Sequence, residues 1–527
     1  MRKGLMRRAP VASACVLAIV VAGCSATASP ASLSPAVGRR TASPAPTASP
    51  APTLPGPVAT DPAIIAAEPT IVDENLRAGS SDWRMGGAGY QVGTDIGAEI
   101  KGYASEASVN VGQPITLFVS VAPAQQFKID IYRLGWYGGT GGRLMTGGTW
   151  LPGATQDACP IEAGLRSCDW KPSIRFTVPG RWVSGIYLAI LTNERHFQNA
   201  VHFVVRDDAS TSPLLYVQPV TTYQAYNPWP RDGSGRSLYA TTRVSFDRPY
   251  ADDGIARSFF DFEQPFVAWL ERAGYQVSYA TSIDLHQQGA ALLRRHRVMV
   301  TAGHDEYWTA EMRVAATSGL ANGTSLAFFS ANNMYWQARL EAGPDGRADR
   351  VLVCYRTETL DPEPSPVLKT VRWRDAPVSL PELNLLGAEY TNMVAGRAPW
   401  VVAGDSSWVY QGTGLSNGQS IADLVWGESD RPQSPTPAAA PKATVLSDSP
   451  FQTHYGQTDR SQAVLYQARS GAWVFNASTF GWTGAINPFG QPDPRVERMT
   501  ANLLDRMGSA TAHRSDAAMR FATRMGP

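Results

Sequence analysis

The chain has 527 residues, 43% of them hydrophobic and 17% charged, so it is long enough to form two or three hydrophobic cores. Its 46 basic and 45 acidic residues leave a net charge of +1, which excludes nucleic-acid binding through a general electrostatic field. The 47 glycines and 39 prolines favour a turn-rich protein of β or α/β type.

The first residues predict export. MRKGLMRRAP is positively charged, and the apolar VASACVLAIVVAG that follows is too short to span a bilayer. It ends in VAGC (residues 21–24), which resembles the lipobox of bacterial lipoproteins. We therefore predict a lipoprotein signal peptide over residues 1–23 and acylation of Cys24, which would anchor the protein outside the cytoplasm on the cell membrane. An ordinary signal peptide cut nearby is the alternative interpretation.

Three segments have the composition of irregular chain. Residues 24–72 are rich in Pro, Ala, Ser and Thr and are predicted to form a disordered tether, because they cannot bury enough apolar surface to fold. Residues 428–442 are predicted to be a Pro-rich surface insertion, and residues 510–527 a flexible tail.

Cysteine spacing predicts one disulfide. Cys159 and Cys168 lie nine residues apart in a Gly-containing loop of an exported chain, which favours a local disulfide. The pair lacks the second pair of ligands that a zinc site needs. Cys354, in the apolar run VLVCYR, is expected to be a buried and inert thiol.

Residues 73–210 are predicted to form a β-sandwich. Short apolar or alternating runs follow one another without helical periodicity, separated by Gly, Pro and Asn turns. These runs are ITLFVSVA, FKIDIYRLGWY, SIRFTVP, GIYLAILTN and NAVHFVVRD.

Residues 211–509 alternate strands with helices, which predicts an α/β domain with a mainly parallel sheet. The strands PLLYVQP, YQVSYAT, RVMVTAG and TSLAFFSA are separated by helical patterns, and further strands are expected at RVLVCYR, SWVYQG, AVLYQAR and GAWVFNAS. Thr309 is expected to cap the helix in TAEMRVAATSGLANG. Asp493 and Pro494 are expected to begin the last helix.

Polar loops follow four of these strands. They are TTYQAYN, HDEYW (residues 304–308), NNMYW and TFGWTGAIN. The carboxyl ends of parallel strands meet at one edge of a sheet, where α/β proteins bind their ligands. The sequence therefore predicts a pocket at this edge, lined by Tyr223, Tyr226, Glu306, Asn333 and Trp482.

Several motifs, in this order, resemble the large (beta) subunit family of N,N-dimethylformamidase. They are GYASEASVNVGQPITLFVS, IYRLGWYGGTGGR, TTYQAYNPW, HDEYW, NNMYWQ and VFNASTFGW, and the resemblance spans about residues 73–507. It implies an α+β multidomain fold in which an Ig-like β-sandwich precedes a glutamine-amidotransferase-like domain. It also implies an amide hydrolase that uses a mononuclear iron held by two tyrosines and one glutamate.

Under this resemblance, Tyr307 and Tyr335 are the expected tyrosine ligands, because each ends a strand loop. Glu389, in LLGAEYTN, is the expected carboxylate ligand, and Glu306 is its competitor. A phenol ionises near pH 10, so it binds only a strongly Lewis-acidic ion such as ferric iron. Both tyrosines have a structural alternative as core aromatics.

The remaining polar residues of the two loops are candidates for catalysis. His304 or Asp305 would act as the general base on a water molecule, and Asn332 would hold the carbonyl oxygen of an amide. Asp305 or Glu306 could instead serve only the dipole of the following helix. No G-x-S-x-G elbow precedes a helix and no Gly-rich phosphate loop follows a strand, and Cys354 is not at a strand–helix turn where a nucleophile would sit.

Two functions follow from these patterns. The first is a surface lipoprotein that hydrolyses the C–N bond of a small or envelope-derived amide, with the membrane as its anchor. The second is a non-catalytic envelope protein that binds glycan or another polymer in the same aromatic crevice. The sequence leaves the substrate and the oligomeric state open.

Overall fold

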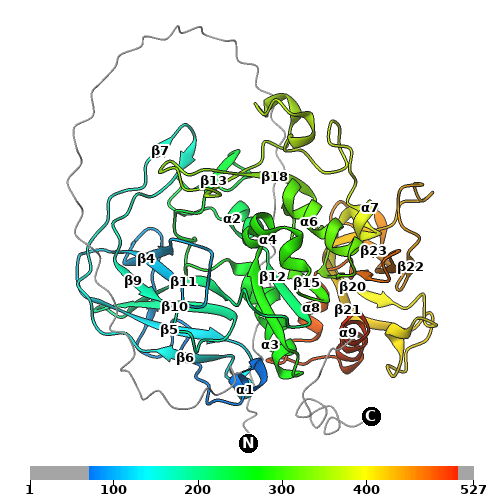
Figure 1. Cartoon of the computed structure of the whole chain (residues 1–527), viewed down its shortest axis with the longest axis horizontal. Helices are drawn as coiled ribbons and strands as arrows, with labels where there is room; N and C mark the ends of the chain where they lie inside the picture. Colours follow the sequence, from blue (N-terminus) through cyan, green and yellow to red (C-terminus); the bar gives the residue numbers. More distant parts are fainter. Residues whose placement is uncertain (1–69, 509–527) are drawn as a thin grey trace, which may run out of the picture. The chain divides into compact units, whose positions relative to one another are not determined.

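The computed structural model describes residues 70–508, coloured from blue to red in Figure 1. The predicted signal peptide, Cys24, residues 24–69 of the tether and the tail over 510–527 lie outside the described residues. The described part is a mixed α/β structure with several sheets. Within residues 70–508, no helix combines the length and apolar character needed to cross a membrane.

The first part of the described chain consists of two sheets around one core. A six-stranded sheet has the order β1-β11-β10-β5-β6 with β3 beside β11, and a three-stranded sheet has the order β2-β4-β9. Both sheets contribute to one hydrophobic cluster, which includes Leu117, Ile131, Leu191 and Phe203. Two sheets sharing a core are what the short alternating strands predict. The strands are β1 (Gln91–Val92), β2 (Ile100–Ala104), β3 (Ser108–Asn110), β4 (Pro114–Val121), β5 (Phe127–Leu134), β6 (Gly142–Thr146), β9 (Ile174–Thr177), β10 (Gly185–Asn193) and β11 (Phe197–Arg206).

A disulfide-linked hairpin extends from this part. Strands β7 (Ile161–Glu162) and β8 (Leu165–Arg166) pair antiparallel between Cys159 and Cys168. These two cysteines form a disulfide, as predicted, and Cys354 is a free, buried thiol.

The second part is built on a seven-stranded sheet. Its order is β14-β12-β15-β17-β26-β25-β22. The first five strands are parallel to one another, β25 is antiparallel to β26, and β22 is antiparallel to β25. The parallel strands β12, β14, β15 and β17 are buried at every position, because both faces of the sheet are covered. The strands are β12 (Leu214–Gln218), β14 (Val277–Thr281), β15 (Val298–Gly303), β17 (Ser325–Ser330), β22 (Thr444–Val445), β25 (Val464–Gln467) and β26 (Trp473–Asn476).

Helices connect the parallel strands. The Thr309 hydroxyl caps α6 by accepting a hydrogen bond from the Met312 N–H. The Asp493 carboxylate caps α9, whose first residue is Pro494. Both caps are as predicted. The helices are α1 (Ile71–Asn75), α2 (Val220–Tyr226), α3 (Gln264–Arg272), which continues a π-helical turn over Phe259–Glu263, α4 (Ser282–Gln288), α5 (Ala290–Leu293), α6 (Ala310–Ala321), α7 (Leu383–Leu386), α8 (Gly481–Ala485) and α9 (Pro494–Met507).

Three segments differ from the predicted elements. SWVYQG contains a 3₁₀ turn (Trp408–Tyr410) rather than a strand, because the Asn502 side chain of α9 binds backbone carbonyls of this segment. The end of HDEYW forms a short strand, β16 (Tyr307–Thr309). Residues 428–431 belong to a buried strand instead of the Pro-rich insertion, since the prolines that prevent strand pairing begin only at Pro432.

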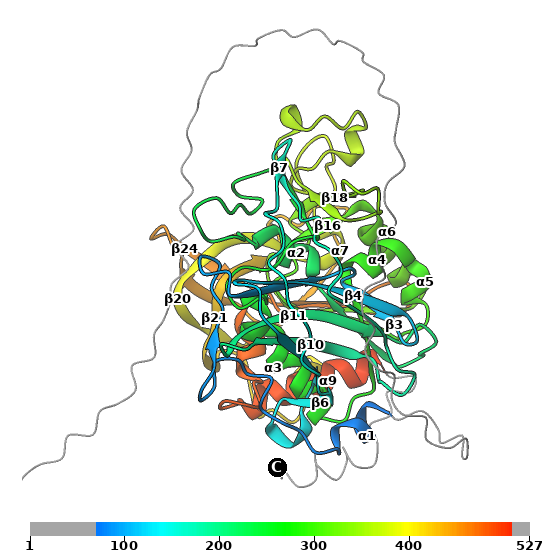
Figure 2. The ribbon, with the colours of Figure 1, turned by 90° about the vertical axis from the view of Figure 1, so that its left-hand side faces the viewer.

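The smaller sheets lie beyond the parallel strands. Strand β16 pairs with β18 (Trp336–Glu341) in a sheet of order β13-β19-β18-β16, completed by β13 (Arg243–Ser245) and β19 (Val351–Val353). A long hairpin joins β20 (Glu389–Val401) to β21 (Ser420–Arg431), and Figure 2 shows its yellow ribbons side by side. A second hairpin joins β23 (Ser449–Gln452) to β24 (Thr458–Ser461).

A buried ion pair joins the two parts. Arg133 of β5 lies 2.7 Å from Glu271 of α3, and neither side chain is exposed. The Tyr279 hydroxyl of β14 donates a hydrogen bond of 2.7 Å to the same carboxylate. Removing one member of such a pair leaves an uncompensated charge in the interior, which typically costs about 3–5 kcal/mol.

Candidate functional site

The HDEYW corner begins where β15 ends at Gly303. This glycine has a φ of +85°, and a Cβ added to it would lie 3.1 Å from the Cβ of Phe262, so the turn requires glycine. The backbone N–H groups of Glu306 and Tyr307 both donate to the Thr222 hydroxyl of α2, at 3.0 and 3.2 Å. Helix α2 thereby fixes the direction in which the corner presents its side chains.

The loop after β17 is bound to the same corner. The backbone N–H of Met334 donates to the Asp305 carbonyl, and that of Tyr335 to the Glu306 carbonyl. Asn332 and Met334 adopt φ values of 52° and 56°, in the left-handed region that non-glycine residues rarely occupy. Such strain persists where surrounding contacts hold the backbone in place, and it often marks functional sites.

Asp430 holds this loop from the β20–β21 hairpin. Its carboxylate accepts hydrogen bonds from the Asn332 backbone N–H at 2.7 Å and from the Asn476 side chain at 3.0 Å. Burial raises the pKa of Asp430 to about 7. Residues from three elements of the sheet edge are thus connected through one buried carboxyl group.

Two phenols and one carboxylate meet at the centre of the site. The Tyr226 hydroxyl donates to Glu306 Oε2 at 2.5 Å, and it lies 3.0 Å from the Tyr239 hydroxyl. Asn332 Nδ2 donates to the other oxygen, Glu306 Oε1, at 3.4 Å. Glu306 is buried, whereas Tyr239 is 44% exposed, so the cluster opens to solvent on the Tyr239 side. We call Tyr226, Tyr239 and Glu306 the oxygen cluster.

A histidine lies beside the oxygen cluster. His304 Nε2 is 3.0 Å from Glu428 Oε2 and 3.4 Å from Glu306 Oε2. Its ring contacts those of Tyr226 and Phe480, with centroids 5.1 and 4.9 Å apart. Burial by itself lowers the pKa of His304, but the carboxylates of Glu428 and Glu306 raise it to about 9. The imidazole is therefore protonated at neutral pH and forms ion pairs with the two carboxylates.

The oxygen cluster fits the ligand set of a ferric ion. Metal–oxygen bonds of about 2 Å place neighbouring ligands about 3 Å apart, close to the separations of 2.5 and 3.0 Å seen here. Burial raises the pKa of Tyr226 and of Tyr239, so ionising these phenols requires a strongly Lewis-acidic cation. Across residues 70–508, no group of three or more His, Cys, Asp or Glu forms a metal-binding cluster; the oxygen cluster contains only one such residue.

The predicted tyrosine ligands lie around the oxygen cluster. Tyr307 is fully buried, its ring is perpendicular to that of Tyr226 at 6.2 Å, and its hydroxyl has no hydrogen-bond partner among the described residues. Tyr335 packs on Tyr390 with centroids 5.3 Å apart, and the guanidinium of Arg374 lies 5.4 Å from its ring centroid. The structure thus places Tyr335 next to the guanidinium group of Arg374.

The predicted carboxylate ligand has other partners. Glu389 accepts a hydrogen bond from the Gln433 side chain and lies 3.6 Å from Arg374. A carboxylate that already faces a guanidinium has much of its charge compensated. Glu306, which was the competing candidate, is the carboxylate that accepts a hydrogen bond from the Tyr226 hydroxyl.

Asp305 stabilises the corner on which it lies. Its two carboxylate oxygens accept hydrogen bonds from the Thr301 hydroxyl at 2.9 Å and the Trp308 indole N–H at 2.8 Å. Burial raises the pKa of Asp305 to about 6, although these hydrogen bonds lower it. Both oxygens are therefore engaged in holding the turn.

The predicted pocket residues are divided between several places. Tyr226 and Glu306 belong to the oxygen cluster, and Asn333 is buried beside Asn332, with both its polar atoms lacking partners within the described chain. Tyr223 packs against the ring of His202. Trp482 is fully buried in the main core, where its indole N–H donates to Thr500.

Sequence analysis missed four residues near the site: Tyr239, Glu428, Asp430 and Phe480. Tyr239 lies in SGRSLYATT, which carries no periodicity or motif. Glu428 and Asp430 follow IADLVW, whose apolar and polar residues partly alternate. That alternation could have predicted a strand reaching Asp430 if the start of the Pro-rich segment had been placed at Pro432.

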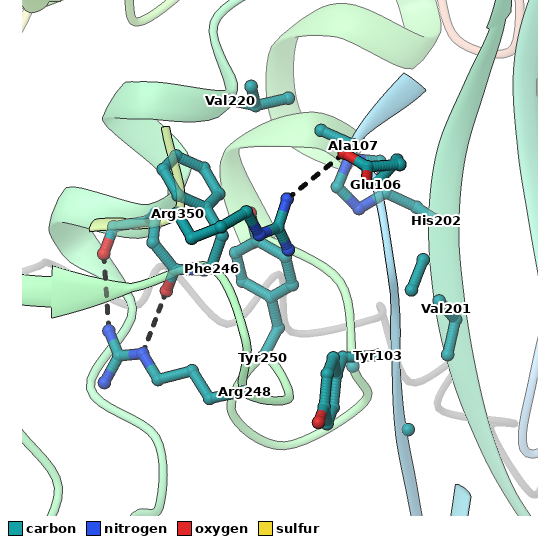
Figure 3. A pocket seen from close by; sticks show the side chains of 14 residues that line it. Tyr103, Glu106, Ala107, Val201, His202, Val220, Phe246, Arg248, Tyr250 and Arg350 are labelled. Carbon is teal, nitrogen blue, oxygen red and sulfur yellow. Dashed lines mark hydrogen bonds and ion pairs between the residues drawn. The ribbon is translucent and has the colours of Figure 1, made fainter. Parts of the chain in front are cut away.

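A hollow open to solvent, with about 420 Å³ of space that includes solvent, lies on another side of α2 and is shown in Figure 3. Val220 and Gln224 of α2 contribute to its wall, together with His202 of β11. Neither ring nitrogen of His202 has a hydrogen-bond partner in the part of the chain that the structure describes. Burial lowers the pKa of His202 to about 4. Helix α2 therefore contributes to both this hollow and the oxygen cluster.

Sequence comparison identifies related proteins. The family described as N,N-dimethylformamidase beta subunit-like, C-terminal, matches residues 128–496. The N,N-dimethylformamidase beta subunit of Alcaligenes sp is 41% identical over 229 residues, which cover 34% of this chain and 30% of that protein. The beta subunit of Paracoccus aminophilus is 40% identical over 70 residues, which cover 13% and 9% of the two chains. The chain thus spans less than a third of either relative's length in these alignments.

Solved structures give only distant similarities. The alkylpurine DNA glycosylase AlkC of Pseudomonas fluorescens, bound to DNA with an abasic site analog, has a TM-score of 0.14 and 16% identity. That match covers 21% of this chain and 31% of the other. Similarity at this level does not bear on the fold or the site.

Proposed function

Because the chain belongs to the N,N-dimethylformamidase beta subunit-like family, we propose that it is a metal-dependent hydrolase of carboxamide C–N bonds. The observation that carries this proposal is the convergence of Tyr226, Tyr239 and Glu306 next to the His304–Glu428 pair. The substrate proposed is a small or envelope-derived amide.

We propose the oxygen cluster as the iron site, in place of Tyr307, Tyr335 and Glu389. Its Tyr226 hydroxyl lies within hydrogen-bonding distance of both Glu306 and the Tyr239 hydroxyl, whereas Glu389 is engaged by Arg374 and Gln433. Phenolate and carboxylate oxygens are hard, anionic ligands suited to a ferric ion. An iron ion bound there would supply Lewis acidity toward the carbonyl group of the substrate.

The His304–Glu428 pair is proposed to move the proton. Because His304 has a pKa of about 9 and lies 3.0 Å from Glu428 Oε2, it is protonated at neutral pH, so it can give its proton to the leaving amine and then regain one from the attacking water. Phe480 packs against the imidazole of His304 and excludes water from that side of the ring. Exclusion of water strengthens the electrostatic contacts of His304.

Asn332 is proposed to orient the substrate. Its Nδ2 is committed to Glu306, whereas its Oδ1 is buried without a hydrogen-bond partner in residues 70–508. A buried acceptor without a partner is unfavourable, so an amide N–H of the substrate would satisfy it. The left-handed backbone of Asn332 and its bond to Asp430 hold this acceptor in place.

The cellular setting is also a proposal. The resemblance supports an Ig-like domain over residues 73–210 and a glutamine-amidotransferase-like domain over residues 211–509. The VAGC motif supports lipid anchoring at Cys24. The Cys159–Cys168 disulfide agrees with an oxidising, extracytoplasmic compartment.

Metal content and colour test this function. Protein purified without chelators should contain iron in stoichiometric amount and show a visible tyrosinate-to-iron absorption band. Tyr226→Phe and Tyr239→Phe should each lose the band and most of the iron, because each removes one ligand oxygen. The matched control Tyr335→Phe should keep both.

The opposite results would assign the iron to other ligands or replace the proposed function. If Tyr335→Phe lost the band and Tyr239→Phe kept it, the ligand set of Tyr307, Tyr335 and Glu389 would replace the oxygen cluster. Colourless, metal-free protein that binds glycan would support the alternative of a non-catalytic envelope protein.

A further inference from the structure

Four arginines surround a small hollow beside the disulfide-linked hairpin. The hollow is a shallow depression open to solvent, with about 250 Å³ of space that includes solvent, and its wall includes Arg166 of β8, Arg236, Arg243 of β13 and Arg248. Ser234 and Thr241, two residues with hydroxyl groups, complete the polar part of the wall.

Arg248 is a buried cation in this wall. It is 2% exposed, and its donors bind neutral oxygens, including the Gln224 side chain at 3.1 Å and the carbonyls of Asn227 and Trp229 at 2.8 and 3.2 Å. Among the ion pairs of residues 70–508, none includes Arg248. Burial and, to a smaller extent, the nearby charge of Arg166 lower its pKa to about 9. Figure 3 shows two of the hydrogen bonds of Arg248 from the side of the other hollow.

The positive charge of the other three arginines is compensated by ion pairs only in part. Arg166 donates to the Ser234 hydroxyl at 3.1 Å, and Arg236 is exposed. Neither takes part in an ion pair within the described chain. Arg243 lies 3.4 Å from Glu341, and both side chains are partly exposed, where such a pair contributes little.

We propose that this hollow binds a phosphoryl group, either as free phosphate or as the terminal phosphate of a larger anion. Guanidinium forks bind phosphate oxygens in pairs. A phosphate offers three or four oxygens and about two negative charges, enough for several arginines and the hydroxyls, whereas a carboxylate offers two oxygens. The exposed side of the hollow at Arg236 leaves room for the rest of a larger ligand.

The hollow shares a loop with the oxygen cluster. Ser234, Arg236 and Thr241 lie in the segment that also carries Tyr239. A phosphoryl group bound to them and to Arg166 would tie this segment to the disulfide-linked hairpin. The binding itself does not depend on the proposed hydrolase activity.

Calorimetric titration with inorganic phosphate tests the proposal, with sodium chloride at matched ionic strength as the reference. We expect saturable binding at one site. Arg166→Gln and Arg236→Gln should each raise the Kd about tenfold or more, because each removes a charge-assisted contact. The control Arg195→Gln, on the β10–β11 turn, should leave the Kd unchanged. Arg236 is exposed, so its replacement should not affect folding.

A parallel titration with glycerol 3-phosphate distinguishes the two sources. Binding of both compounds supports a site for the free anion, and binding of the ester alone supports a site for a terminal phosphoryl group. The proposal is overturned if neither compound binds better than chloride. It is also overturned if Arg236→Gln binds phosphate as tightly as the parent, which would place the phosphate elsewhere, for example on the metal.

Discussion

Glu306 is the residue at which the contacts of the candidate site meet. One of its oxygens accepts from Tyr226 and the other from Asn332, while His304 lies 3.4 Å away. A buried carboxylate is stable only when its oxygens are bound. The three neighbours therefore determine where Glu306 points, and through it where Tyr226 and Tyr239 meet.

His202 gives a prediction for the pH dependence of stability. Its pKa is about 4 in the folded protein and about 6.5 in an unfolded chain. Between these values the unfolded state binds more protons, so the free energy of unfolding falls as the pH falls below about 6.5. For His202 alone, this loss amounts to about 2 kcal/mol between about pH 7 and pH 5.

Urea unfolding at these two pH values measures the effect. His202→Phe, whose ring suits the aromatic neighbours Tyr223, Tyr250 and Phe259, should lose about 2 kcal/mol less than the parent on acidification. His454→Phe, at an exposed position, should behave like the parent. An equal loss in the parent and in His202→Phe would show that His202 does not titrate as proposed.

At the residue scale, sequence patterns located the corner but not all of its partners. HDEYW could be placed beyond a buried strand because β15 is a clear apolar run, and its Glu306 was a candidate ligand. The other two ligand oxygens of the oxygen cluster come from Tyr226 and Tyr239. The chain contains 19 tyrosines, and no local pattern shows which of them meet in space.

At the scale of elements, the β20–β21 hairpin completes the site. It delivers Glu428 to His304 and Asp430 to Asn332. The turn at Gly427, which has a φ of +74°, lets the strand pass close to Phe480. The hairpin therefore positions two carboxyl groups and one aromatic wall together.

Gly427→Ala tests this role of the hairpin. The added Cβ would lie 2.4 Å from Phe480 Cδ2, so it should displace that ring and, with it, His304. We expect a loss of about 1 kcal/mol from the left-handed backbone and about 1–3 kcal/mol from overpacking. Chemical denaturation measures the total.

Gly418→Ala is the matched control. Gly418 precedes the same strand with a φ of +81°, and an added Cβ there would meet no atom within 4 Å. Only the backbone loss of about 1 kcal/mol is expected. Equal destabilisation by the two substitutions would mean that Phe480 is not held against the hairpin.

The element pattern was more predictable than the small sheets. The parallel strands and the caps at Thr309 and Asp493 follow from local apolar runs and capping residues, whose signals lie within a few positions. Strand β16 depends on pairing with β18, about 30 residues further along the chain, and the β20–β21 hairpin contains register shifts. Such pairing leaves little local trace.

On the scale of the whole molecule, the two parts meet through a shared hydrophobic cluster and one buried charge pair. Arg133 of the first part pairs with Glu271 of the second, which fixes α3 and β14 against the six-stranded sheet. The mixed α/β character with several sheets could be predicted from the strand and helix patterns, whereas a domain boundary near residue 210 stays a prediction. The charge pair could not be predicted, because neither residue lies in a recognisable motif.

The central claim is that Tyr226, Tyr239 and Glu306 hold one iron ion. The most direct test is a crystal structure of iron-containing protein with anomalous diffraction recorded at the iron absorption edge. The account predicts a single strong anomalous peak within bonding distance of the two phenolic oxygens and the Glu306 carboxylate. A peak between Tyr307 and Tyr335, or the absence of iron from fully active protein, would contradict it.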